Sequence, residues 1–113
     1  MGEEMIIELM RISVPRGKHQ EFAKALESLV SPIQLQPGCL SCQLFQAWPQ
    51  QNGLHIEARW ENQEYLVQYL RSQDYKRLLL LIELSASPPV VEFFNVLEIR
   101  GLDLAESARS SPE

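Results

Sequence analysis

The sequence is poor in basic residues and has no long hydrophobic run. Ten basic residues stand against fifteen acidic ones, so the formal net charge is −5 and the pI is about 5.0. This balance argues against a general binder of nucleic acids or anionic membranes, because both require a basic surface. The longest apolar run, residues 78–82, is far shorter than the roughly 18 residues that cross a membrane. We therefore expect neither nucleic acid nor membrane as a partner.

Cysteine is scarce, and the N-terminus lacks the features of a secretory signal. Glu3 and Glu4 stand where a signal peptide needs positive charge, so export is not expected. Two cysteines without a secretory signal suggest a reducing compartment, which predicts a cytoplasmic protein. With 113 residues, of which 45% are hydrophobic and 22% charged, the chain has the size and composition of one globular domain.

The first half of the chain predicts a strand, a helix and a hairpin. Residues 5–14 form a β-rich run that ends at a Pro-Arg-Gly turn. Apolar residues then recur at helical spacing, and Pro32 should kink or end this helix near Ser31. Residues 39–48 and 54–60 follow as two strands, joined by a connection with an Asn-Gly pair that is typical of a hairpin.

The second half predicts a broken helical region and a last strand. Asn62 and Ser72 each suit the N-cap of a helix, and residues 90–99 form the strand. The resulting β-α-β-β-α-β order indicates an α+β, ferredoxin-like fold, a four-stranded antiparallel sheet with the helices on one face. We assign residues 1–100 to this single domain and 101–113 to a C-terminal tail, a short helix with a disordered end. The stripe that the last helix should bury consists of Tyr75, Leu78, Leu79 and Ile82.

Two strands are apolar on both faces. In the strand 5–14, Ile6 and Met10 lie on one face and Ile7 on the other, and residues 90–99 show the same two-sided character. Strands that are buried on both sides have this pattern. Because two helical stretches cover only one face of a four-stranded sheet, we predict that a second copy of the chain covers the other face, in a homodimer.

Three stretches of the sequence resemble the antibiotic biosynthesis monooxygenase domain family. They are Pro-Arg-Gly-Lys with the helix after it, Gln-Pro-Gly-Cys-Leu-Ser-Cys-Gln-Leu, and Ala-Arg-Trp-Glu-Asn-Gln-Glu-Tyr-Leu-Val-Gln-Tyr-Leu-Arg-Ser-Gln-Asp-Tyr. The resemblance spans about residues 5–99. It implies a dimeric α+β barrel in which two ferredoxin-like sheets pack face to face. For several members it further implies oxidation of quinols or polycyclic aromatics by O₂ without flavin, haem or metal, so no cofactor is expected.

At the expected site the resemblance is partial. Trp60 matches the family tryptophan that ends the third strand and faces the pocket. Ala58 stands where the family commonly has a glutamate, and Tyr69 stands where it often has a histidine. The haem-degrading branch uses an asparagine, this tryptophan and a histidine, but the corresponding positions hold Met10, Trp60 and Leu79. Because the iron ligand is missing, haem degradation is not expected.

Oxidation by O₂ alone needs an electron-rich substrate, usually made by removing a phenol or enol proton inside an apolar pocket. We predict a pocket for a small aromatic ligand between helices and sheet, with Glu8 and Tyr69 as the catalytic candidates. Glu8 lies on an otherwise apolar strand face, so it is either paired at the sheet edge or a pocket base with a raised pKa. The predicted substrate-binding residues are Met10, Ala58, Trp60 and Tyr69, whereas Tyr75 is expected in the core.

The histidines and cysteines are weaker candidates. His19 is expected to be solvent-exposed on the polar side of its helix, and His55 lies on the strand face away from the pocket. Cys39 and Cys42 supply only half the ligands of a structural zinc site. On a regular strand they would point to opposite faces with Cα atoms ~10 Å apart, too far for a disulfide. We therefore predict no metal, and a redox pair would need a tight turn directly before Cys39.

Two functions remain open. One is a cofactor-independent monooxygenase that oxidises a small aromatic or quinol-like compound with O₂. The other is a non-catalytic small-molecule-binding or regulatory dimer on the same barrel, which the missing family glutamate and histidine favour. The monooxygenase should hold a buried ionisable group beside a planar cavity, whereas a filled, dry core would favour the second function. Trp60 is predicted to mark the ligand pocket.

Overall fold

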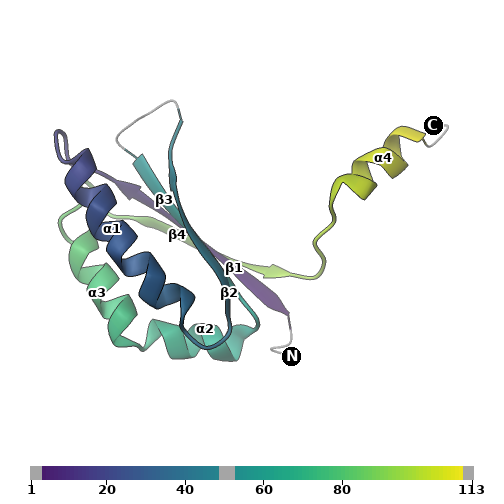
Figure 1. Ribbon diagram of the computed structural model, residues 1–113, viewed down its shortest axis with the longest axis horizontal. Coiled ribbons are helices and arrows are strands. Elements are labelled where there is room, and N and C mark those ends of the chain that lie inside the picture. Colours follow the sequence, from purple (N-terminus) through teal and green to yellow (C-terminus); the bar gives the residue numbers. More distant parts are fainter. Residues whose placement is uncertain (1–3, 49–52, 111–113) are drawn as a thin grey trace.

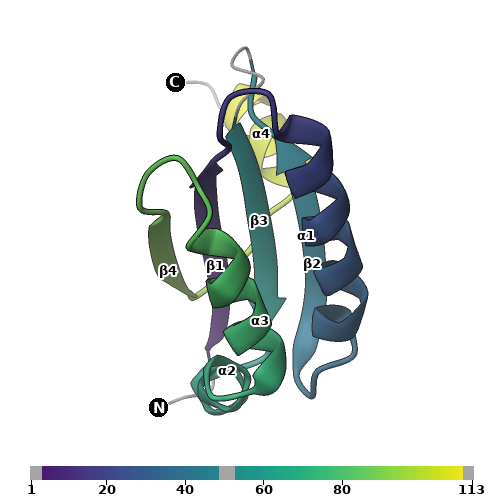
Figure 2. The same cartoon turned by 90° about the vertical axis from the view of Figure 1, so that its left-hand side faces the viewer.

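The computed structural model describes residues 4–48 and 53–110 as one sheet with helices on one of its faces (Figure 1). The strands are antiparallel and lie in the order β2-β3-β1-β4, so β1 and β3 are the inner strands. Figure 2 shows α1 and α3 in front of the sheet, with β4 at one edge beyond them. This arrangement confirms the predicted ferredoxin-like α+β fold. The elements are β1 (Met5–Ser13), α1 (His19–Gln34), β2 (Cys39–Gln46), β3 (Gly53–Trp60), α2 (Gln63–Leu70), α3 (Gln73–Ile82), β4 (Val90–Val96) and α4 (Leu102–Ser110).

Alternation along the strands decides which side chains form the core. On β1 the even-numbered residues from Ile6 to Ile12 are buried, and on β3 the even-numbered residues from Leu54 to Trp60 are buried. Leu26 of α1, which is 0% exposed, and apolar residues of α2 and α3 meet this face. Each large apolar side chain buried in this way contributes about 1.5–3 kcal/mol of hydrophobic stabilisation. The core therefore lies between the helices and one face of the sheet.

Helix α1 is longer than predicted, because it continues through Pro32 to Gln34. A proline in the last turn removes only one backbone hydrogen bond, and the continuation buries Ile33, which is 1% exposed. The chain then turns at Gly38, whose φ of +78° lies in the left-handed region. A Cβ at this position would overlap the side chain of Tyr65, so only glycine fits here.

The break between α2 and α3 is set by two N-caps, as predicted. The Asn62 Oδ1 atom accepts a hydrogen bond from the backbone N–H of Tyr65 at 3.1 Å. The Ser72 Oγ atom accepts one from the backbone N–H of Tyr75 at 3.2 Å. Each cap satisfies a donor that the first turn of its helix would otherwise leave unpaired.

Two predictions for the last part of the domain need correction. Leu79 is 43% exposed instead of buried, because Leu78 and Ile82, one turn apart, form the side of α3 that faces the core. The last strand ends at Val96 and does not extend over the predicted range 90–99. Val96 pairs with Met5, the first residue of β1, and the pairing described for residues 4–48 and 53–110 ends there.

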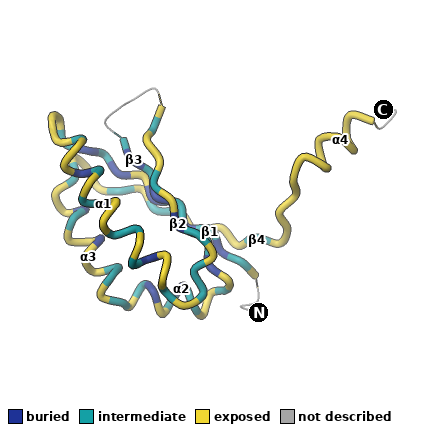
Figure 3. Tube along the Cα trace, viewed as in Figure 1, coloured by how far each residue is buried: buried dark blue, intermediate teal, exposed yellow. Residues whose placement is uncertain are grey.

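Helix α4 lies apart from the rest of the structure, beyond the end of β4 (Figure 1). None of its residues is buried, and Figure 3 shows it as exposed. The disordered end that we expect after this helix falls on residues 111–113, and the hairpin connection falls on 49–52, both outside the described residues. None of the described helices has the length and apolar character that would let it cross a membrane.

Candidate functional site

A row of four residues crosses the helix-covered face of the sheet and includes Glu8. The strand register pairs Glu8 with Ala58 of β3 and with Phe93 of β4, and it pairs Ala58 with Cys42 of β2. Glu8 is 2% exposed and is the one buried charged residue of the described core. It lies on an inner strand, not at the sheet edge, and forms no ion pair within the described residues. The structure therefore does not show the edge pairing that was one alternative for Glu8.

Trp60 supplies the one side-chain hydrogen bond that the described residues give to Glu8. Its indole Nε1–H donates to the Oε1 atom of Glu8 at 3.3 Å, and the indole is 0% exposed. Burial raises the pKa of the Glu8 carboxyl to about 7, although the hydrogen bond from Trp60 favours the charged form and opposes this change. Near neutral pH both protonation states are therefore populated, which suits a group that takes up and releases protons.

Two tyrosines continue the aromatic cluster from Trp60. The ring of Tyr69 stacks on the indole with a centroid distance of 4.6 Å and an interplanar angle of 24°. The ring of Tyr75 meets Tyr69 edge-on, at 5.2 Å and 69°. Such offset and edge-on contacts each add about 0.5–1.5 kcal/mol beyond the burial of area. The three rings together form a rigid apolar wall beside Glu8.

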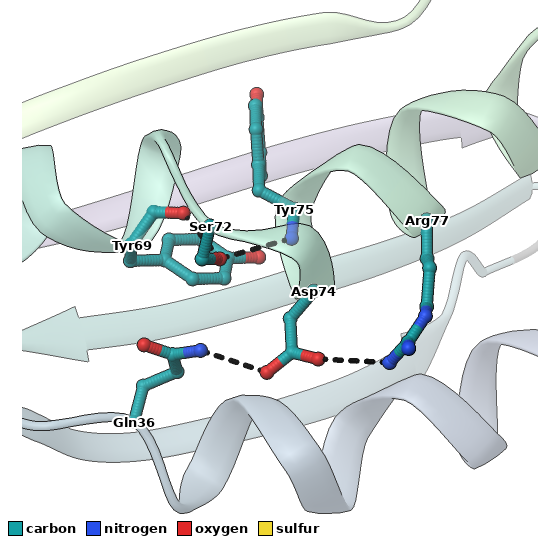
Figure 4. A network of polar contacts seen from close by, with 6 residues as sticks. All are labelled: Gln36, Tyr69, Ser72, Asp74, Tyr75 and Arg77. Carbon is teal, nitrogen blue, oxygen red and sulfur yellow. Dashed lines mark hydrogen bonds and ion pairs between the residues drawn. The ribbon is translucent and has the colours of Figure 1, made fainter.

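The break between α2 and α3 holds the two tyrosines in this arrangement (Figure 4). The Ser72 hydroxyl donates to the backbone carbonyl oxygen of Tyr69 at 2.6 Å and accepts from the N–H of Tyr75. Asp74 in the next turn accepts from Gln36 Nε2 at 2.7 Å and pairs with the guanidinium of Arg77 at 3.2 Å. The Ser72 contacts join the end of α2 to the start of α3, and the contact between Asp74 and Gln36 joins the start of α3 to the loop before β2. Together they hold α3 in place relative to α2.

The acid–base chemistry of the two tyrosines differs from that of Glu8. Burial, together with the nearby charge of Glu8, raises the pKa of the Tyr69 hydroxyl far above its usual range. The same two causes raise the pKa of Tyr75. Both hydroxyls therefore stay protonated near neutral pH and can donate hydrogen bonds. Of the two predicted catalytic residues, Glu8 is the one whose ionisation suits a base, and Tyr69 suits a donor.

The structure brings the predicted binding residues Met10, Ala58, Trp60 and Tyr69 together on one side of the sheet near Glu8. All four are buried, and none is more than 2% exposed. The contact between the Trp60 and Tyr69 rings leaves no gap between them for a planar ligand.

The row of Phe93, Glu8, Ala58 and Cys42 is most exposed to solvent at its Phe93 end, along the margin between α3 and β4. Phe93 is 45% exposed, Leu79 is 43% exposed, and Tyr75 is half-buried. Farther along this margin, Leu79, Ile82 and residues 85–89 contribute to the lining of a surface hollow of about 590 Å³. Phe93 is not among the predicted site residues, because its place beside Glu8 depends on how β4 pairs with β1. Tyr75, which is predicted to belong to the core, is half-buried and packs against it.

The two histidines lie outside this row. His19 is half-buried, contrary to the expected exposure, and its Nε2 atom is shielded from solvent without a hydrogen-bond partner in the described structure. The helical period is a poor guide here because His19 is the first residue of α1. His55 pairs with Arg11 on the face of the sheet away from the helices, in agreement with its predicted orientation.

The prediction that Cys39 and Cys42 point to opposite faces is wrong. A bulge at Leu40 inserts one residue between them, so Cys39 pairs with Trp60 and Cys42 with Ala58, both on the helix-covered face. Both thiols are free, and burial raises their pKa values, that of Cys42 to about 12. No group of three or more His, Cys, Asp or Glu side chains within residues 4–48 and 53–110 is placed to hold a metal ion.

The chain is similar to known proteins in its sequence profile and in its fold. The sequence profile described as antibiotic biosynthesis monooxygenase matches residues 5–79, which include Glu8, Ala58, Trp60 and Tyr69. None of the curated proteins matches this sequence. Solved structures share the fold at low sequence identity.

Three of these structures illustrate the likeness. A protein from Caulobacter crescentus, named a "putative antibiotic biosynthesis monooxygenase", is 21% identical with a TM-score of 0.77, over 86% of this chain and 93% of its own. A protein of the same name from Nitrosomonas europaea is 14% identical with a TM-score of 0.77, over 89% and 98%. A conserved protein from Methanosarcina mazei Go1 is 22% identical with a TM-score of 0.76, over 83% and 94%. At these identities the likeness shows the fold alone, and each of the three matches leaves part of this chain without a counterpart.

Proposed function

This chain belongs to the antibiotic biosynthesis monooxygenase family, and we propose that it oxidises a small phenolic or quinol-like aromatic compound with O₂, with Glu8 as the proton acceptor. The observation that carries the proposal is a carboxyl group held between sheet and helices without a basic partner among the described residues. Burying an unpaired charge costs several kcal/mol, and an apolar side chain of similar volume would stabilise a purely structural core better. A proton-transfer role explains why an acid stands here.

The proposed reaction needs no external reductant, because the substrate supplies all four electrons that O₂ takes up. Glu8 removes the proton of a phenol O–H, and the phenolate donates electron density through a ring carbon. A bond forms between this carbon and O₂, and the O–O bond then breaks as the carbon loses its hydrogen. One oxygen atom stays on the carbon and the other leaves as water. A quinol and O₂ thereby give a hydroxyquinone and water, and Glu8 returns its proton to the departing oxygen.

The aromatic wall assists this chemistry in two ways. The stacked rings of Trp60 and Tyr69 exclude water from the side of Glu8 that they cover, and an apolar environment makes a phenolate more reactive toward O₂. The Tyr69 hydroxyl, which stays protonated, can donate a hydrogen bond to a substrate oxygen. The indole N–H of Trp60 stabilises the charged form of Glu8 before it accepts the proton.

We further propose that the substrate approaches Glu8 from the margin between α3 and β4. Phe93 pairs directly with Glu8 and, at 45% exposed, is the most exposed residue of the row. Tyr75 is half-buried, and its ring meets the edge of the Tyr69 ring at a centroid distance of 5.2 Å. A rotation of the Phe93 ring would admit a planar substrate without disturbing the contacts among Trp60, Tyr69 and Tyr75.

One observation favours the second candidate, a non-catalytic small-molecule-binding or regulatory protein. The Trp60–Tyr69 stack is closed, and the residues predicted to bind the substrate are buried in the absence of a ligand. A filled core is what a scaffold that has lost its chemistry would show. The same margin at Phe93 could then admit a ligand that is held and released unchanged.

Oxygen uptake distinguishes the two candidates. The purified protein is incubated with a panel of hydroquinones and anthrones, in air and in oxygen-free buffer, and O₂ consumption is followed with an electrode. We expect consumption with at least one compound, incorporation of one ¹⁸O atom from ¹⁸O₂ per product molecule, and a rate that rises with pH through about 7. Glu8→Gln should lower kcat by about 10²–10⁴-fold, as expected for loss of a general base.

The control variant is Glu27→Gln, which changes an exposed carboxyl on α1 and should leave the rate unchanged. Uptake by the wild type that Glu8→Gln does not reduce would refute the role of Glu8. The second candidate is tested in a Trp48→Phe background, which leaves Trp60 as the one tryptophan reporter. Saturable quenching of Trp60 fluorescence by a quinone, without any O₂ uptake, would refute the oxidation and support the second candidate, non-catalytic ligand binding.

A further inference from the structure

A surface hollow lies between the end of α3 and the loop that leads into β4. Its volume is about 590 Å³, and its lining includes Leu79, Ile82, Glu83 and residues 85–89. Figure 2 shows this loop at the edge of the sheet, where it joins the end of α3 to the start of β4. The volume falls within the range of about 300–1,000 Å³ that is typical of small-molecule sites. We call this surface the α3–β4 hollow.

The lining of the α3–β4 hollow is mostly apolar. Leu79 and Ile82 contribute branched side chains, and residues 88–89 contribute two proline rings, which have no backbone N–H donor. The hydroxyl of Ser85 donates to the backbone carbonyl oxygen of Ser87 at 2.7 Å, so this donor is already used within the loop. A ligand that enters the hollow therefore meets mainly carbon atoms.

The charge of the lining excludes anionic ligands. Among the described residues that line the hollow, Glu83 is the one with a charged side chain, and it is an acid. The whole chain also carries a net charge of −5. A phosphate or carboxylate group would therefore be repelled here and would find no ion-pair partner in the lining. The hollow suits an uncharged apolar group.

The loop that lines the hollow is anchored at two points. The backbone N–H of Ala86 donates to the carbonyl oxygen of Ser13, at the end of β1, at 2.8 Å. The backbone N–H of Ser85 donates to the carbonyl oxygen of Ile82, in the last turn of α3, at 2.9 Å. The hollow is therefore formed before a ligand binds, which reduces the entropy that binding must remove.

One side of α3 connects the hollow to the aromatic wall. Tyr75, Leu79 and Ile82 are spaced by four and three residues, so they follow one another along the helix. The Tyr75 ring meets the Tyr69 ring at a centroid distance of 5.2 Å, and Leu79 and Ile82 line the hollow. From Tyr75 to Ile82 the helix rises by about 10 Å. The hollow therefore begins one helical turn beyond Tyr75.

The chain before β4 gives a similar distance on the other side of the margin. Pro89 lines the hollow, and Phe93, four residues later, pairs with Glu8. Four residues span at most about 14 Å even when the chain is fully extended. One molecule that consists of an aromatic ring and a hydrocarbon chain can therefore place its ring at the Phe93 end of the row and its chain in the hollow.

We propose that the α3–β4 hollow binds a hydrocarbon chain carried by the aromatic substrate, so that the substrate class is a phenol or hydroquinone with an alkyl substituent. This inference rests on the proposed function, because it places the substrate ring at Phe93 and Glu8. The chain passes Leu79 and reaches residues 85–89. Because the chain takes no part in the reaction, its contacts are the same in the ground state and the transition state. They lower KM and leave kcat unchanged.

A series of hydroquinones tests the proposal with the wild type. All members share one ring, and an unbranched alkyl substituent lengthens from methyl to decyl. The ratio kcat/KM for O₂ uptake should rise by up to about fourfold for each methylene that becomes buried, and the rise should stop when the hollow is filled. The gain should appear in KM. A kcat/KM that is the same for the methyl and decyl compounds would overturn the proposal.

Two neighbouring leucines of α3 provide matched variants. Leu79 is 43% exposed and lines the hollow, whereas Leu80 is 54% exposed and lies outside the described lining. Leu79→Asp should reduce the preference for the decyl over the methyl compound by about tenfold or more, and Leu80→Asp should leave it within about twofold. Ala86→Phe fills part of the hollow and should shift the preferred chain to a shorter length. Equal preferences in Leu79→Asp, Leu80→Asp and the wild type would show that the chain binds elsewhere and would overturn the proposal.

Binding without turnover separates this proposal from the oxidation. The corresponding alkyl quinones, which are already oxidised, are titrated into the Trp48→Phe variant, and their dissociation constants are measured by quenching of Trp60. These constants should fall with chain length, and Leu79→Asp should remove most of this dependence. Circular dichroism checks that each variant is folded.

The two assays together assign each failure. Binding that tightens with chain length, without O₂ uptake from any hydroquinone, would refute the oxidation and support the hollow as the site of the chain. O₂ uptake with a KM and a dissociation constant that do not depend on chain length would refute the role of the hollow and leave the oxidation in place.

Discussion

Replacing Glu8 with glutamine tests whether the carboxyl experiences the apolar environment that the structure shows. Glutamine keeps the shape of the side chain and can still accept the hydrogen bond from the Trp60 indole, but it does not titrate. The folded-state pKa of about 7 lies above the value of 4.5 for the unperturbed side chain. Between these pH values the folded chain holds a proton that the unfolded chain has already released, so the wild type loses stability as the pH rises.

The magnitude follows from the two pKa values. Their difference corresponds to about 3 kcal/mol of unfolding free energy. Below pH 4.5 both states of the chain hold the proton and Glu8 carries no penalty. As the pH rises from 4.5 to 7, the unfolded chain releases the Glu8 proton while the folded chain still holds it, so the unfolding free energy falls. Above pH 7 the folded chain buries a carboxylate, and the loss of unfolding free energy reaches its full value. The stability of Glu8→Gln relative to the wild type should therefore rise by about 3 kcal/mol between pH 4.5 and pH 8.

Guanidinium unfolding followed by circular dichroism provides the measurement. The experiments are run at one protein concentration, because association would make the midpoint depend on concentration. Glu27→Gln, on the exposed side of α1, removes one carboxyl without touching the core and serves as the control. If the free-energy difference between Glu8→Gln and the wild type stays constant from pH 4.5 to pH 8, Glu8 is not desolvated, and its assignment as the proton acceptor fails.

Two predictions concern packing. Trp60→Ala should lower the unfolding free energy by about 3–5 kcal/mol in chemical denaturation, because the indole is 0% exposed and stacks on Tyr69, whereas Trp60→Phe should cost less. A loss below ~1 kcal/mol for Trp60→Ala would show that the indole borders open space. Gly38→Ala should cost at least ~1 kcal/mol more than Gly17→Ala, since both glycines have a left-handed φ but only at Gly38 does an added Cβ meet Tyr65. Equal thermal midpoints for the two variants would contradict this.

Local patterns explain what the sequence predicts well. A strand has a period of two residues, so the faces of β1 and β3 follow from the order of apolar and polar residues alone, and Glu8, Ala58 and Trp60 are assigned to one face correctly. The end of α1 is different. The cost of Pro32 depends on how much its continuation buries, and the burial of Ile33 against the sheet is a tertiary property.

Cross-strand register is the part of the site that the sequence does not determine. Cys42 joins the row of Glu8 through the register of β2 on β3, and the one extra residue of the bulge at Leu40 is enough to bring Cys39 to the same face as Cys42. Phe93 joins the row because β4 pairs with β1 in one particular register. A shift by one residue would place Phe94 beside Glu8 instead and would reverse the two faces of β4.

The strand register also changes the interpretation of the family glutamate that is absent at Ala58. The family resemblance places a glutamate at the position of Ala58, and in the sequence alone its absence favours a protein that has lost its activity. In the structure Ala58 lies directly beside Glu8 on the neighbouring strand. Side chains paired in this way have Cβ atoms about 4.5–5.5 Å apart, and two buried carboxylates at such a separation cannot both ionise without strong repulsion. The small side chain of Ala58 leaves room for one carboxyl in this row, that of Glu8, so the missing glutamate is not evidence against proton transfer at this site.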